Sequence, residues 1–104
     1  MAGSIIIAQN VILGFNTVAF HYIVEKIRSH FDENRKFVME RIYEPLDEGG
    51  MTFIDISVAS TDEFREFCGA TARCRSECNA NPTAYDVWWD RLWEMLSEDS
   101  RFYA

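Results

Sequence analysis

The fold is decided early in the chain, by residues 4–31, SIIIAQNVILGFNTVAFHYIVEKIRSHF. The first half, up to Phe15, is rich in β-branched residues, which favour strands. Because apolar residues stand on both faces of this strand, we expect it to be central in its sheet and covered on both sides. Gln9 and Asn10 interrupt it, either as a bulge or as a turn that splits it into two short strands.

The second half of this stretch predicts an amphipathic helix. Asn16 and Thr17 are typical of a helix N-terminus. Apolar residues then recur at spacings of three and four along one face, at Phe20, Ile23, Val24, Ile27 and Phe31. That period indicates a helix over residues 17–31.

The middle of the chain predicts two further strands, over residues 37–44 and 51–58. In the second, residues that face the core alternate with residues that face away, as in a half-buried strand. The segment between them, Pro45 to Gly50, contains a proline and two glycines and is rich in turn formers. We therefore expect the two strands to form a β-hairpin.

Two helices are expected in the last part of the chain. Ser60 and Glu63 match a capping box, in which a hydroxyl and a carboxylate satisfy two backbone N–H groups at a helix start. Asn81 and Pro82 end that helix and begin the last one, because proline suits the first helical position. The last helix is predicted over residues 82–98.

The predicted order of elements over residues 1–104 is β-α-β-β-α-α, a single compact α+β domain. It favours a three-stranded, mainly antiparallel sheet with helices packed on one face, a truncated ferredoxin-like arrangement without the last strand. Such a sheet would keep an exposed edge, which could pair with another subunit or with a partner strand.

Composition excludes several classes of protein. A length of 104 residues fits one domain, and a hydrophobic content of 48% is too high for a disordered chain. Seventeen acidic residues stand against ten basic ones, which gives a net charge of −7. Direct nucleic-acid binding is not expected, because phosphate contacts need clustered Lys and Arg. A partner drawn by charge should instead present a basic surface.

The cysteines predict neither a disulfide framework nor a metal site. Cys68, Cys74 and Cys78 are odd in number and form no CxxC pair, and neither His21 nor His30 is close in sequence. We expect reduced thiols that serve packing, and no metal or other cofactor. The chain shows no signal-peptide pattern and no apolar run of the roughly 18–20 residues that span a bilayer, so a cytoplasmic protein without membrane contact is expected.

The last helix carries the candidate partner-binding residues. Its apolar side, which includes Trp88 and Trp89, is expected to face the core. Carboxylates recur at steps of four on the opposite side, and Trp93 lies at the border, where an aromatic residue can anchor a partner. The predicted partner-binding strip consists of Asp86, Asp90, Trp93, Glu94 and Glu98. An ordinary solvated helix face is the alternative interpretation of the same spacing.

No enzyme is predicted, because the chain has no nucleophile elbow, zinc-protease, phosphate-loop or dinucleotide motif. We predict a small acidic inhibitor that occludes a basic, nucleic-acid-handling protein surface. Immunity proteins, antitoxins and phage-encoded anti-defence proteins of the anti-CRISPR kind share this profile. Two alternatives stay open: a dimeric ligand-binding or catalytic domain with a pocket lined by Cys68, His21 or Tyr43, and an accessory subunit of a larger complex. A monomer and a homodimer are both compatible with the sequence.

Overall fold

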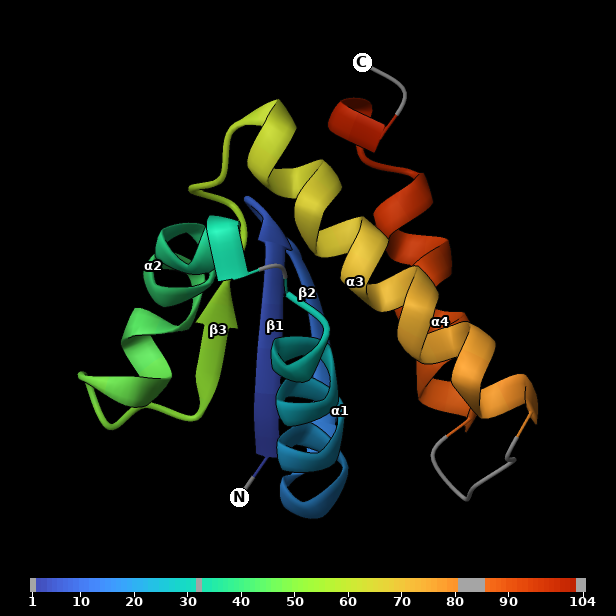
Figure 1. The fold of residues 1–104 in the computed structure, drawn as a ribbon. Coiled ribbons are helices and arrows are strands. Elements are labelled where there is room, and N and C mark those ends of the chain that lie inside the picture. The colour runs from blue at the N-terminus through green and yellow to red at the C-terminus, as the bar shows by residue number, and fades with distance from the viewer. Residues whose placement is uncertain (1, 32, 81–85, 103–104) are drawn as a thin grey trace.

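The strands form a three-stranded sheet of order β2-β1-β3 (Figure 1). The computed structural model describes residues 2–31, 33–80 and 86–102. Strand β1 (Ala2–Ala8) pairs antiparallel with β2 (Val11–Asn16) and parallel with β3 (Phe53–Asp55). The sheet is therefore mixed, with one antiparallel and one parallel pair of strands.

A tight turn at Gln9 and Asn10 joins β1 to β2. Asn10 has a φ of 65°, in the left-handed region that asparagine tolerates better than most residues. The pairing register shifts between Ile6 and Ala8, so an irregularity of the bulge type precedes the turn. Of the two alternatives for Gln9 and Asn10, the turn that splits the segment into two strands is confirmed.

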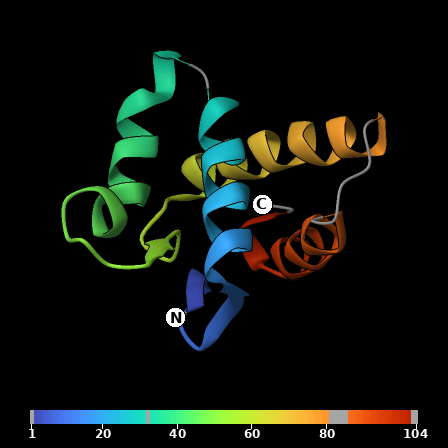
Figure 2. The same ribbon diagram turned by 90° about the horizontal axis from the view of Figure 1, so that it is seen from below.

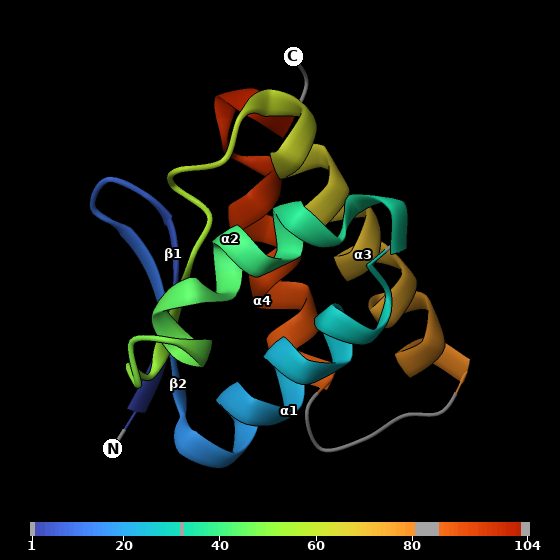
Figure 3. The ribbon, with the colours of Figure 1, turned by 60° about the vertical axis from the view of Figure 1, so that its left-hand side comes forward.

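Helices cover one face of the sheet and leave the other face open. Ile5 and Ile7 of β1 and Ile54 of β3 have no exposed surface, whereas Ile12 of β2, whose side chain points to the opposite face, is 54% exposed. Figure 3 shows the helices gathered on one side of the sheet. The prediction that helices pack on one face is confirmed. The prediction of a first strand covered on both sides is wrong, because the apolar residues of its second face stay in contact with solvent.

The first helix, α1 (Thr17–Ser29), forms where the sequence predicts it. The side chain of Asn16 caps it, since Asn16 Oδ1 accepts a hydrogen bond from the backbone N–H of Ala19 at 2.8 Å. The expected apolar face is buried, and Tyr43 of the next helix donates its hydroxyl to the Val24 carbonyl. Seen from below, α1 lies between α2 on one side and α3 and α4 on the other (Figure 2).

The strand predicted over residues 37–44 is wrong, because this segment is helical. A short 3₁₀ turn, η1 (Glu33–Arg35), leads into helix α2 (Lys36–Asp47). The core takes up Val38 and Ile42, which are four residues apart and so share a helix face, and leaves Phe37 63% exposed. The β-hairpin predicted with residues 51–58 is wrong as well, since β3 pairs with β1.

The second half of the chain largely follows the prediction. Strand β3 forms inside the predicted segment 51–58 but is shorter, and helix α3 (Thr61–Ala80) starts at the predicted capping box. The Ser60 N–H donates to Glu63 Oε1 at 2.8 Å, and the Glu63 N–H donates to Ser60 Oγ at 3.3 Å. Asn81 and Pro82, the expected start of the last helix, lie outside the described residues.

Helix α4 (Asp86–Ser97) and a final 3₁₀ turn, η2 (Ser100–Phe102), complete the described chain. The observed order of strands and α-helices is thus ββααβαα, so the predicted order and its truncated ferredoxin-like interpretation are corrected. The single α+β domain with a three-stranded sheet is confirmed. No helix in the described ranges is long and apolar enough to cross a bilayer.

Gly3 allows α1 to lie close against β1. A Cβ atom on Gly3 would stand 2.2 Å from Cγ and 2.6 Å from Cβ of Phe20, whose side chain is fully buried. These two atoms lie near the backbone of α1, so they cannot move without shifting the helix. Gly14 of β2 is different, because no atom lies within 4 Å of the corresponding position.

We predict that Gly3→Ala lowers the free energy of unfolding by about 1–3 kcal/mol, because it overpacks the contact between β1 and α1. The matched control is Gly14→Ala, which adds the same methyl group to an open position and should change stability by no more than about 0.5 kcal/mol. Urea unfolding followed by tryptophan fluorescence measures both. Equal stability of the two variants would contradict the proposed contact.

Candidate functional site

The predicted core side of α4 is buried. Trp89, Leu92 and Leu96 have at most 1% of their surface exposed. Trp88 is half-buried, and its ring centroid lies 4.8 Å from that of Phe15 on β2. This packing attaches α4 to the end of the sheet and turns its other side outward.

The carboxylates of the predicted strip face solvent. Asp90, Glu94 and Glu98 are all exposed, the last of them just beyond the helix end. Asp86 is the first residue of α4, and its side chain lies outside the description. The Asp90 carboxylate already has a partner, because Arg75 of α3 donates its Nε–H to Asp90 Oδ1 at 2.9 Å. The described strip is therefore a solvated acidic face that is partly neutralised from within the protein.

Trp93 lies beside this face but is half-buried. Its ring packs edge-on against Phe102 of η2, with centroids 5.4 Å apart. The guanidinium of Arg75 stands 5.8 Å from the Trp93 ring centroid. Trp93 thus holds η2 on α4, and its role as an anchor for a partner stays a prediction.

A second acidic face lies on α2, in the segment for which the sequence predicts a strand. Glu40, Glu44 and Glu48 follow one another at steps of four and are all exposed. As a strand, this segment would place Ile42 on the same face as Glu40 and Glu44, and only the helix separates them. The sequence does carry a signal for this face, because its glutamates recur at the same four-residue step as the carboxylates on α4. Within the described part of the chain, none of these three glutamates forms an ion pair.

A hollow lies between α2 and the loop that follows β3, and we call it the α2 groove. Its volume is about 550 Å³, and it is lined by Arg41, Glu44, Pro45, Glu48, Gly49, Asp55 and Val58. Three of these seven residues are acidic, one is basic, and the lining is otherwise apolar. The guanidinium of Arg41 forms an ion pair with the carboxylate of Glu63, the capping residue of α3. The hydrogen bond from the Ser60 N–H, together with Arg41, keeps the pKa of Glu63 below its usual value.

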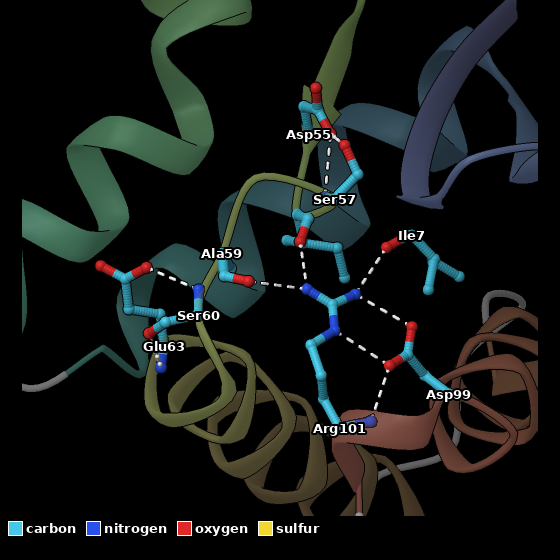
Figure 4. Close-up of polar contacts among 9 residues, drawn as sticks. Ile7, Asp55, Ser57, Ala59, Ser60, Glu63, Asp99 and Arg101 are labelled. Atoms are coloured by element: carbon cyan, nitrogen blue, oxygen red, sulfur yellow. Dashed lines mark hydrogen bonds and ion pairs between the residues drawn. The ribbon is translucent and has the colours of Figure 1, made fainter.

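The loop that forms one wall of the groove is fixed by hydrogen bonds on three sides (Figure 4). At its start, Asp55 Oδ1 accepts hydrogen bonds from the backbone N–H and the hydroxyl of Ser57. At its end, the capping box of Ser60 and Glu63 adds two more hydrogen bonds. From inside the protein, Arg101 Nη1 donates to the carbonyl oxygens of Ile56 and Ala59, both at 2.9 Å. The wall is therefore fixed by contacts within the chain.

Arg101 also ties the end of the chain to β1. Its Nη2 donates to the carbonyl oxygen of Ile7 at 2.8 Å, and its guanidinium carbon stands 4.2 Å from the ring centroid of Phe64. The Asp99 carboxylate accepts from Arg101 Nε and Nη2, at 2.9 Å each, so it balances the charge in a poorly solvated place. These hydrogen bonds hold the pKa of Asp99 below its usual value. No local signal in the sequence marks this contact, since Arg101 and Ile7 are 94 residues apart.

We predict that Arg101→Met lowers the free energy of unfolding by about 2–4 kcal/mol. The variant keeps the aliphatic stem but removes the Arg101 hydrogen bonds to the carbonyls of Ile7 and Ala59 and leaves Asp99 without its cation. Thermal and urea unfolding measure the loss. Arg65→Met is the control, because Arg65 is exposed on α3 and should change stability by no more than about 0.5 kcal/mol. Similar losses in both variants would show that Arg101 has no special structural role.

The residues of the alternative ligand pocket do not meet in one site. His21 is exposed on α1, Tyr43 is fully buried against it, and Cys68 is buried in α3. Burial raises the pKa of the Cys68 thiol to about 12, so it is not a thiolate nucleophile. Cys74 is also buried, and the side chain of Cys78 lies outside the described residues. Among the residues that the structure describes, no cluster of three His, Cys, Asp or Glu could hold a metal ion.

A small α+β domain whose described surface offers acidic helix faces is typical of an inhibitor that works by binding another protein. No protein-family model matches the chain. The chain is 31% identical to the immunity protein CdiI of Burkholderia pseudomallei over 103 residues, which cover 97% of this chain and 94% of that protein. It also matches a solved structure of the CdiA-CT toxin from Burkholderia pseudomallei E479 in complex with its cognate CdiI immunity protein. That match has a TM-score of 0.92 and 30% identity, and it covers 97% of this chain and 99% of the matched chain.

The chain belongs to the CdiI immunity protein family. This membership confirms the prediction of an immunity protein among the inhibitor types considered, and the prediction that the chain is not an enzyme. The family does not by itself locate the surface that binds a partner.

Proposed function

We propose that this chain is an immunity protein that binds a CdiA-CT-type toxin and blocks its action. The observation that carries the proposal is the match, over nearly the whole chain, to the CdiI protein that was solved in complex with its cognate toxin. Immunity by occlusion needs no reaction chemistry in the inhibitor. It needs only a stable surface that complements the toxin in shape and charge.

We further propose that the toxin surface is basic and handles nucleic acid. A net charge of −7 and exposed carboxylates on both α2 and α4 support this, because opposite charge speeds the encounter of two proteins and disfavours wrong partners. A toxin that binds nucleic acid must itself carry clustered basic residues. The proposed compartment is the cytoplasm, in keeping with the odd number of cysteines and the buried thiol of Cys68.

Co-expression with the cognate CdiA-CT-type toxin domain tests the proposed function. We predict that the chain co-purifies with that domain and restores growth of cells that produce it. The CdiA-CT toxin of Burkholderia pseudomallei E479 serves as a second probe, which measures how far immunity extends beyond a cognate pair. Absence of a complex with the cognate toxin domain at micromolar concentrations, together with unrelieved toxicity, would disprove the function.

We propose that the acidic strip on α4 steers the toxin toward the immunity protein. Because Asp90 and Trp93 already have partners inside the protein, the strip acts through its field more than through close contact. Charges at the margin of an interface change mainly the association rate, whereas charges inside it change mainly the dissociation rate.

We predict that changing Glu94 and Glu98 together to Lys slows toxin association by about tenfold at low salt and leaves the dissociation rate nearly unchanged. Asp90 is kept in this variant because its loss would leave Arg75 unpaired. The effect should fade at high salt, where exposed charges are screened. Stopped-flow or biosensor kinetics across a salt series measure both rates. Changing the same two residues to Gln alters the net charge by half as much, so it should slow association less. An association rate unchanged at low salt would contradict the steering role.

A further inference from the structure

We propose that the α2 groove receives a lysine or arginine side chain of the toxin. This inference rests on the proposed function and names the contact through which that function would be exerted. The groove differs from the α4 strip because it combines a hollow, apolar lining and free carboxylates in one place.

The lining of the groove matches the two parts of a long basic side chain. Pro45 and Val58 supply apolar surface, and Val58 is 57% exposed. Lysine and arginine bury their aliphatic stems against such surface and keep the charged head at a polar rim. The carboxylates of Glu44, Glu48 and Asp55 provide that rim, and hydrogen bonds between a charged donor and a carboxylate are among the strongest available to a side chain.

The balance of charge in the groove also favours a cation. Arg41 is the single basic residue in the lining, and its charge is already compensated by Glu63. Glu44 and Glu48 have no ion-pair partner among the described residues. Both hydrogen bonds that Ser57 gives to Asp55 end on Oδ1, so the second carboxylate oxygen is available to a ligand.

Contacts within the chain hold both walls of the groove. Arg101 holds the loop from Ile56 to Ala59 from behind, and the capping box fixes its end at Ser60 (Figure 4). The opposite wall is the regular helix α2. A partner side chain that enters such a site does not have to order the loop, which lowers the entropic cost of binding. A metal ion is a poorer occupant, because the carboxylates here do not form a metal-binding cluster among the described residues.

Filling the groove gives the first test. Val58→Arg places a guanidinium of this chain among the rim carboxylates, where it competes with the side chain of the toxin. Val87→Arg on α4 is the matched control, because Val87 is 59% exposed and the change in net charge is the same. We expect the Val58 variant to dissociate from the cognate toxin domain at least tenfold faster than the wild-type chain, and the Val87 variant to dissociate at nearly the wild-type rate.

Removing the charges gives the second test. The double change Glu44→Gln and Glu48→Gln is compared with Glu94→Gln and Glu98→Gln, so that both variants lose the same charge. Because all four side chains are exposed, urea unfolding should show that both variants keep their stability. We expect both pairs to slow association alike, and only the groove pair to speed dissociation, by about tenfold.

The outcomes separate this inference from the proposed function. If the wild-type chain binds the toxin and the groove variants dissociate no faster than their controls, the groove is not the contact and the inference is overturned, while the immunity function stands. If the wild-type chain does not bind the toxin, the proposed function fails and the inference fails with it. Faster dissociation confined to the groove variants supports the inference.

Discussion

The arrangement of the whole domain depends on the hydrogen bonds and the ion pair that the guanidinium of Arg101 forms. Strands β1 and β3 are parallel, so both end at the same edge of the sheet and leave carbonyl groups there without strand partners. One cation from the far end of the chain satisfies the carbonyls of Ile7, Ile56 and Ala59, and Asp99 compensates its charge. The contact closes the chain on itself and positions α3 and α4 over one face of the sheet.

The same contact prepares the surface that we connect with function. Arg101 holds the loop after β3 from the inside, and the outside of that loop forms one wall of the α2 groove. Carboxylates spaced at four residues on α2 and α4 repel each other, at a cost of about 0.2–0.5 kcal/mol per pair in an isolated helix. That cost is small compared with the stability of a folded domain, and the exposed carboxylates of both helices stay accessible at the surface.

Sequence patterns predict those parts of the fold that depend on neighbours along the chain. The period of apolar residues and the Asn16 cap define α1, and the capping box at Ser60 defines the start of α3, because both signals come from contacts three or four residues apart. The α4 strip could be found for the same reason. The segment 37–44 is predicted as a strand but forms a helix, and a strand does not show the acidic face of α2. Its β-branched and aromatic residues suit either structure, and packing of Val38 and Ile42 in the core selects the helix.

The sequence by itself determined the α+β class, two helix starts, the sign of the surface charge and the type of protein, an acidic inhibitor without catalytic motifs. These properties follow from composition and from local spacing. Only the tertiary structure decided the parallel pairing of β3 with β1, the open face of the sheet, and the groove between α2 and the loop after β3. Each of these requires residues far apart in the chain to meet, as Arg101 and Ile7 do across 94 positions. Such contacts depend on the free energy of the whole packed core and leave no periodic signal in the sequence.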